Sequence, residues 1–219
     1  MDCIISPKNA LLLDKLMNSI KSNELIIDSN SKLLLQMVSD DKTKCCNISL
    51  DNDFFISVSL KNKLVVMNKP KFYMNKMKVL KIFTYDNMLV FDYEFEDYVY
   101  RHRFFAHKTN IFTINFTPCK VTNVDINLFL EVLKQVKNGD SKFVFDEEFA
   151  YIQNGENTIK FKCSNFNNVS FELCPTIFRM ILSSCKMFNE AILCWENKGC
   201  PINLIFRSAN IQASYFCAV

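Results

Sequence analysis

Two histidines and ten cysteines are the residues of this chain that could serve as bases, nucleophiles or metal ligands. His102 and His107 are five residues apart in and just beyond a strand pattern, so we expect them to face opposite sides of that strand. Cys45 and Cys46 are neighbours and face opposite sides for the same reason, and no Cys-x-x-Cys pair could complete a zinc site. The sequence therefore predicts no metal and no cofactor, and it favours no particular Cys–His pair for nucleophilic catalysis.

Several carboxylates lie close together, as general acid–base chemistry would need. Asp40-Asp41 and Glu147-Glu148 fall in turns, and Asp92, Glu94 and Glu96 fall in a hairpin, where solvated carboxylates are ordinary. The three glycines all occur at turns, so no glycine-rich phosphate loop is present. We interpret the chain as a protein without catalytic activity.

Basic residues recur seven positions apart in segments with a helical pattern, and such residues could contact phosphate groups. Seven residues make about two helical turns, so each pair lies on one helix face, away from the apolar stripe. On a single helix, such a pair of basic residues is as consistent with an ordinary solvent-exposed face as with a phosphate-binding one. Four helices aligned in two neighbouring domains would instead form one basic surface that contacts DNA without reading bases. The predicted DNA-binding residues are Lys8, Lys15, Lys71, Lys78, Lys134, Lys137, Arg179 and Lys186.

The elements that would position these residues occur twice along the chain. Helical patterns begin at Pro7, Pro70, Val124 and Pro175, and the second of them is expected to run to about Phe83. Residues 3–13 are echoed by residues 119–130, which indicates an internal repeat. We predict an α+β protein with two similar β-α-β-β-β-α-β-β domains, residues 1–116 and 117–219, each with helices on one face of antiparallel sheets.

Two strands are expected at sheet edges, Val99–Phe105 and Thr158–Phe161. Their unpaired backbone groups could join another chain or be protected by charged side chains. A proline at Ile159 is expected to remove one ladder donor from the second edge. Between residues 108 and 118 lies an apolar linker, which is either ordinary core or a binding surface.

The final third of the chain resembles a known family. Phe171–Leu182 is similar to the entry into the last helix of eukaryotic sliding clamps, and Glu190–Phe206 is similar to their strand, Gly-x-Pro turn and strand. Tyr215–Val219 corresponds to the end of their last strand. The resemblance is greatest to the nine subunit of the checkpoint (nine-one-one) clamp, a relative of proliferating cell nuclear antigen. It implies a DNA-clamp fold, in which three subunits close a six-domain ring.

This resemblance implies a nuclear, non-catalytic subunit of a DNA-encircling checkpoint clamp that acts as a platform for DNA damage signalling and repair. The implied partners are double-stranded DNA without sequence specificity, two related clamp subunits, an ATP-dependent clamp loader, and repair and signalling proteins, with no membrane. The implied subunit interface consists of Val99, Arg101, Arg103, Phe105, Thr158, Ile159, Lys160 and Phe161. The implied pocket for partner peptides consists of Ile111, Phe112, Ile114 and Phe116.

Two other functions stay open, a homotrimeric replication processivity clamp and a protein- or ligand-binding module unrelated to DNA. Self-pairing of the two edges would set Arg101 or Arg103 against Lys160 or Lys162, and like charges oppose strand pairing. We therefore predict a heterotrimer rather than a homotrimer.

The amino-acid composition limits the class of protein to which this chain can belong. Hydrophobic residues make up 49% of the chain and charged residues 22%, as in ordinary globular proteins. The net charge of +3 is too small to argue for nucleic-acid binding by itself. We find no secretory signal and no apolar run of the ~18 residues that a membrane-spanning helix needs. We interpret the scattered cysteines as reduced core residues of an intracellular protein.

Overall fold

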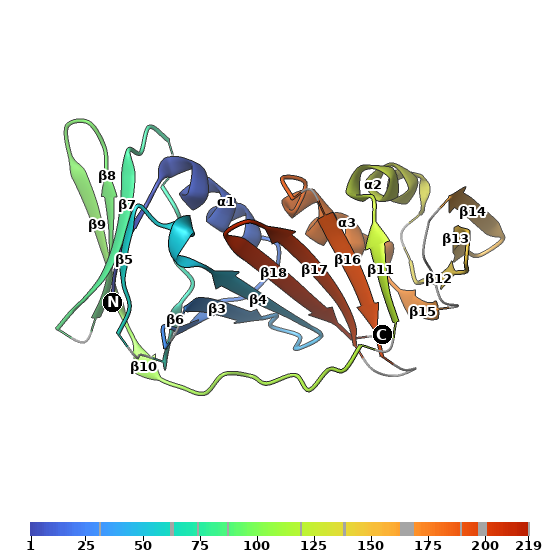
Figure 1. The fold of residues 1–219 in the computed structure, drawn as a ribbon, viewed down its shortest axis with the longest axis horizontal. Helices are drawn as coiled ribbons and strands as arrows, with labels where there is room; N and C mark the ends of the chain where they lie inside the picture. Colours follow the sequence, from blue (N-terminus) through green and yellow to red (C-terminus); the bar gives the residue numbers. More distant parts are fainter. Residues whose placement is uncertain are drawn as a thin grey trace. The chain divides into compact units, whose positions relative to one another are not determined.

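The computed structural model describes residues 1–30, 32–61, 64–73, 75–86, 88–118, 120–137, 139–162, 169–188, 190–196 and 201–218 (Figure 1). The chain divides into two compact units. Unit 1 contains Met1–Thr113 with Ala209–Ala213, and unit 2 contains Ile114–Ser208 with Ser214–Val219. No described helix is long and apolar enough to cross a membrane.

The described residues of unit 1 form two antiparallel sheets and one α-helix. Its elements are β1 (Asp2–Ile5), α1 (Pro7–Met17), β2 (Glu24–Asp28), β3 (Leu33–Val38), β4 (Lys44–Leu50), the 3-10 turn η1 (Asn52–Phe54), β5 (Ser57–Ser59), β6 (Leu64–Asn68), β7 (Val79–Tyr85), β8 (Met88–Glu94), β9 (Val99–Phe105) and β10 (His107–Lys108). One sheet has the order β5-β1-β7-β8-β9, and the other contains β10-β6-β2-β3-β4. Helix α1 begins at Pro7 because the Ser6 hydroxyl accepts a hydrogen bond from the Asn9 backbone N–H at 3.3 Å.

In unit 2, the part of the chain that the structure describes contains two helices between strands. Its elements are β11 (Lys120–Val124), α2 (Ile126–Gln135), β12 (Ser141–Phe145), β13 (Phe149–Asn154), β14 (Asn157–Lys162), β15 (Val169–Leu173), α3 (Pro175–Ser184), β16 (Glu190–Trp195), β17 (Ile202–Ser208) and β18 (Ile211–Cys217), the last of which is shared with unit 1. The strands β18-β17-β16-β11 lie in one sheet, and β14-β13-β12-β15 form another. Helix α2 begins where the Asp125 carboxylate accepts hydrogen bonds from the N–H groups of Asn127 at 2.9 Å and Leu128 at 3.0 Å.

The two units repeat the same order of strand pairing. The order β1-β7-β8-β9 in unit 1 corresponds to β11-β16-β17-β18 in unit 2, and β4-β3-β2-β6 corresponds to β14-β13-β12-β15. Each run contains the strands in equivalent places along the chain. The predicted α+β architecture of two similar domains is therefore confirmed.

The predicted second helix of the first domain is wrong. The described residues between Lys69 and Lys78 form no helix, and residues 79–85 form β7. Strand β7 pairs with β1 on one side and with β8 on the other, and this pairing buries Leu80 and Ile82. The side chains alternate between the two faces of this sheet, which matches a period of two rather than a helical period. Strand β15 was not predicted from the sequence.

Aromatic side chains hold the irregular segment before β7 in place. The Phe72 and Phe91 rings meet edge to face at 6.3 Å, and the Tyr73 and Tyr93 rings do so at 5.4 Å. The Tyr93 hydroxyl donates a hydrogen bond to the Lys71 carbonyl at 3.1 Å. These contacts let the segment pack on the sheet without helical structure.

Candidate functional site

Helix α1 carries two of the predicted DNA-binding residues on its exposed side. Lys8 and Lys15 are both exposed, whereas Ala10, Leu13, Leu16 and Met17 are buried. Neither lysine forms an ion pair with any residue that the structure describes. Both ammonium groups are therefore available to an anionic partner.

Lys71 and Lys78 do not lie on a helix, which corrects the sequence prediction. Lys71 is an exposed residue of the irregular segment, and Lys78 directly precedes β7. The Lys78 ammonium pairs with the Glu96 carboxylate at 2.9 Å. Because β7 replaces the expected helix, these two lysines share no helical face, and the charge of Lys78 is partly compensated.

On α2, a carboxylate shares the face of the predicted basic residues. The Lys134 ammonium contacts the Glu131 carboxylate at 2.6 Å. The hydrogen bond and the charge of Lys134 lower the pKa of Glu131, and the charge of Lys186 lowers it further. Lys186, in the turn after α3, is therefore electrostatically coupled to α2.

Helices α2 and α3 pack together through the rings of Phe129 and Phe178, whose centroids are 5.5 Å apart. Arg179 of α3 is half-buried, and its guanidinium donates to the Thr176 hydroxyl at 3.3 Å. Lys137 lies exposed just beyond α2. The exposed predicted cations without an ion pair in the described part of the chain are Lys8, Lys15, Lys71, Lys137 and Lys186.

The strand β9 ends its sheet, and all seven of its residues pair with β8 on one side. The Phe95 N–H donates to the Tyr98 carbonyl at 2.9 Å, which closes the β8–β9 hairpin with a hydrogen-bonded pair. Hydrogen-bonded and non-hydrogen-bonded pairs alternate along an antiparallel ladder. Tyr100, His102 and Phe104 therefore bond to β8, and the backbone groups of the alternate residues point to the open side. These residues are Val99, Arg101, Arg103 and Phe105.

The strand β14 ends the other sheet of unit 2 in the same way. Asn154 pairs with Asn157 across the two-residue turn of Gly155 and Glu156. The closing pair of such a hairpin is hydrogen bonded, so Ile159, two residues further, bonds inward to Ile152. A proline at Ile159 would therefore remove a donor from inside the hairpin and not from the open edge, which corrects the sequence prediction. Thr158, Lys160 and Lys162 present their N–H groups to that edge.

The charges on the two edges differ in how they are compensated. The Arg101 guanidinium donates to both carboxylate oxygens of Asp92, at 2.7 and 2.6 Å. Arg103 forms no ion pair within the described residues. The Lys160 ammonium lies over the ring of Phe149, 3.6 Å from its centroid, and Lys162 is exposed. Both open edges are thus positively charged.

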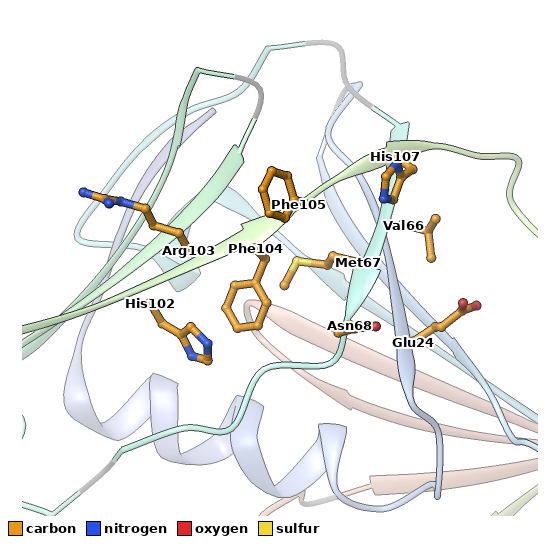
Figure 2. A pocket seen from close by; sticks show the side chains of 9 residues that line it. All are labelled: Glu24, Val66, Met67, Asn68, His102, Arg103, Phe104, Phe105 and His107. Carbon is orange, nitrogen blue, oxygen red and sulfur yellow. The ribbon is translucent and has the colours of Figure 1, made fainter.

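A cavity of about 460 Å³ lies between β9 and β6 in unit 1 (Figure 2). We call it the β6–β9 notch; its lining is residues 66–68 of β6, residues 102–105 of β9, Glu24 and His107. Figure 2 shows the side chain of Met67 reaching toward the ring of Phe104, while Arg103 points away from β6. Of this lining, only Arg103 and Phe105 were predicted as functional, because no local sequence pattern indicates that β9 and β6, which belong to different sheets, line one cavity.

The apolar linker is fixed to unit 1 by one buried side chain. The Gln36 amide accepts a hydrogen bond from the Phe112 N–H at 2.7 Å and donates one to the Phe112 carbonyl at 2.8 Å. The ring of Phe112 is 55% exposed. Nothing in the sequence marked Gln36 as a contact of the linker, since the two residues are 76 positions apart.

The remaining predicted pocket residues have different surroundings. Ile111 and Ile114 are half-buried, and the Phe116 ring meets that of Phe216 at 5.8 Å. None of the four linker residues lines the β6–β9 notch. Within the described residues, no group of three or more His, Cys, Asp or Glu side chains could hold a metal ion.

Comparison with known proteins identifies the fold. No protein-family model and no curated protein matches the sequence. Among solved structures, the chain is similar to the crystal structure of PCNA from Thermococcus kodakaraensis, with a TM-score of 0.75 and 11% sequence identity. The match covers 99% of this chain and 98% of that one. The chain therefore has the DNA-clamp fold of PCNA along essentially its whole length.

Proposed function

We propose that this chain is a non-catalytic subunit of a sliding clamp that encircles double-stranded DNA. The observation that carries the proposal is the likeness to PCNA over 99% of the chain, at a TM-score of 0.75. The exposed lysines of α1 and those beyond α2 and α3 support it, because cations on helices suit contact with phosphates of any sequence.

The finer proposal is a heteromeric checkpoint clamp, in which this chain is most similar to the nine subunit. Its partners would be two related clamp subunits, an ATP-dependent clamp loader, and repair and signalling proteins in the nucleus. The sequence resemblance of residues 171–219 and the positive charge on both open edges support this version. A homotrimeric replication clamp is the alternative.

Charge reversal tests the DNA contact directly. The variants are Lys8→Glu with Lys15→Glu, and Lys137→Glu with Lys186→Glu. Each pair should weaken binding to duplex DNA of any sequence and reduce the slope of log K against log salt by about one for each lost phosphate contact. Fluorescence anisotropy with two unrelated duplexes at several salt concentrations measures both quantities.

Two controls make the test specific. Lys42→Glu with Lys142→Glu changes the net charge equally at exposed positions in a turn and on β12, and it should leave the slope unchanged. Lys78→Glu should have a smaller effect than Lys15→Glu, since Glu96 already compensates Lys78. Equal losses in all these variants, or no loss in any, would refute the DNA role and favour a module unrelated to DNA.

A further inference from the structure

One face of the β8–β9 hairpin carries exposed aromatic side chains that the proposed contact with duplex DNA does not use. This face is buried at Phe91 and Phe104, and it becomes exposed toward the turn of the hairpin. Tyr98 and Tyr100 share the face of Phe104, because residues two apart in a strand lie on the same side. They are 62% and 39% exposed. The core-facing side of the sheet therefore continues, at this end, as an aromatic surface open to solvent.

The rings of this surface hold one another in place. The Tyr98 ring stacks on that of Phe95, with the centroids 4.5 Å apart and 15° between the planes. The Tyr100 ring meets that of Tyr73 at 4.7 Å and that of Tyr93 at 5.9 Å. Tyr73 is exposed, whereas Tyr93 is fully buried. We call Tyr73, Phe95, Tyr98 and Tyr100 the aromatic platform.

The geometry of the platform suits unpaired bases. Phe95 covers one side of the Tyr98 ring, and the exposure of Tyr98 leaves the other side open to a further planar group. Tyr98 and Tyr100 are two residues apart in extended backbone, which separates them by about 6.8 Å, twice the roughly 3.4 Å rise per nucleotide in duplex DNA. Neighbouring bases reach that spacing only when they are unstacked from each other, as in a single strand bound to aromatic side chains.

Charged side chains near the platform favour an anionic partner. Lys71 and Lys76 are exposed in the irregular segment before β7, and neither forms an ion pair with a described residue. The turn of the hairpin carries Asp97 and Glu96, and the Glu96 carboxylate pairs with the Lys78 ammonium at 2.9 Å. The lysines outnumber the carboxylates. Cations beside exposed aromatic rings are the combination that binds single-stranded nucleic acids.

We propose that the aromatic platform binds single-stranded DNA, with bases stacked on Tyr98 and Tyr100. The phosphates that link these bases contact Lys71 or Lys76. The contact goes beyond the proposed duplex contact because it uses the faces of unpaired bases. The choice of DNA over RNA rests on the proposed function. The platform gives this chain a means to distinguish DNA with a single-stranded stretch from an intact duplex.

Removal of the bases from the probe tests the proposal without changing the protein. The probes are a fluorescent 12-nucleotide oligothymidylate and an abasic oligomer of the same length, which has the same phosphates and no bases. Fluorescence anisotropy with the full chain should show that the oligothymidylate binds about fivefold more tightly or better. Equal binding of the two probes overturns the proposal.

Removal of the rings tests the location. Tyr98→Ala with Tyr100→Ala should weaken binding of the oligothymidylate by about fivefold or more and leave binding of the abasic oligomer unchanged. Tyr98→Phe with Tyr100→Phe keeps the rings and removes the hydroxyl groups, so it should bind both probes as the wild type does. Tyr85→Ala, which removes an exposed tyrosine at the end of β7, is the matched control and should have no effect.

Circular dichroism shows whether these variants are folded. Full binding of the oligothymidylate to a folded alanine variant overturns the proposal. If that variant loses only self-association in sedimentation velocity, the platform is covered by protein rather than DNA, and the proposal is likewise refuted.

The single-strand test and the duplex test fail separately. Loss of the preference for bases, with intact salt-dependent duplex binding through Lys8 and Lys15, refutes the platform alone. Loss of the duplex effect, with an intact preference for bases, refutes the clamp function and leaves a site for single strands.

Discussion

At the scale of single residues, the side chain of Gln36 forms hydrogen bonds with the backbone of the linker. Its amide pairs with both backbone groups of Phe112, and it also donates to the Asn47 side chain at 2.9 Å. Gln36 is 1% exposed, so its amide has little access to water as an alternative partner. The linker is thereby held on the sheet through contacts that do not depend on the Phe112 ring.

Gln36→Ala should free the linker at this point. The loss of both hydrogen bonds should lower the free energy of unfolding by about 1–2 kcal/mol. The Phe112 amide should exchange its hydrogen faster, as measured by mass spectrometry of a peptide that spans residues 109–116. Gln153→Ala, at an exposed position of β13, should change neither quantity. Unchanged exchange in the Gln36 variant would show that other contacts hold the linker.

A second residue-scale prediction concerns pH. Burial raises the pKa of Cys185 to about 12 from a usual value of 9.0, although the Tyr215 hydroxyl acts to lower it. The folded state prefers the neutral thiol, so this contribution to stability is fully present below pH 9 and is lost as the pH rises toward 12. By pH 10.5 the loss from this thiol should be about 2 kcal/mol.

Urea unfolding at pH 8 and pH 10.5 measures that loss. Cys185→Ala should reduce the fall in stability between the two pH values, whatever it does to stability at pH 8. Cys174→Ala is the contrasting variant, because hydrogen bonds from Thr176 and Gly139 outweigh burial and lower the pKa of Cys174. An equal pH dependence in wild type and Cys185→Ala would contradict the assignment to Cys185.

At the scale of elements, the hairpin of β13 and β14 decides which backbone groups are free. Ile159 bonds inward to Ile152, and Lys160 presents its N–H outward, because the ladder alternates from the Asn154–Asn157 pair. Proline removes the backbone N–H at either position, but among the described residues only the inward N–H of Ile159 pairs within the sheet. The two neighbouring positions should therefore differ strongly in their tolerance of proline.

Ile159→Pro should lower the free energy of unfolding by about 3 kcal/mol, since it breaks a ladder hydrogen bond. Lys160→Pro should cost about 1 kcal/mol more than Lys160→Ala, which accounts for the lost contact of Lys160 with Phe149. Urea unfolding of the isolated chain measures all three variants. Equal destabilisation by the two prolines would show that the ladder alternates differently.

At the scale of the whole molecule, we expect the charge on the two open edges to limit self-association. Arg103 on β9 and the two lysines of β14 are all cationic, and like charges directly opposite one another destabilise strand pairing. We expect the purified chain to sediment as a species smaller than a trimer at micromolar concentration. A stable homotrimer under these conditions would favour the replication clamp over the heteromeric one.

Reversing the charge on β14 should increase self-association. Lys160→Glu with Lys162→Glu should promote self-association of the full chain, because its carboxylates would then attract Arg103 of a second copy rather than repel it. Lys160→Gln with Lys162→Gln removes the charge without reversing it and should have an intermediate effect. Sedimentation velocity of the three proteins at equal concentration checks the order.

The sequence determined most of the local structure, because the signals for it are short in range. Pro7, Pro175 and the Asp125 cap define helix starts within a few residues of chain, and alternating apolar residues define strands such as β9 and β14. The echo of residues 3–13 in residues 119–130 was sufficient to predict two similar domains. The lysines of α1 could be placed on an exposed face from helical spacing alone.

Contacts between residues far apart in the sequence decided the features that local patterns did not predict. Residues 79–85 form a strand because β1 and β8 lie on either side of them, and local preference after Pro70 did not reveal those neighbours. Glu96, 18 residues away, compensates Lys78, and Gln36 holds Phe112 across 76 residues. The β6–β9 notch lies between strands of two different sheets, and the pattern of neither strand indicates that the other lies beside it.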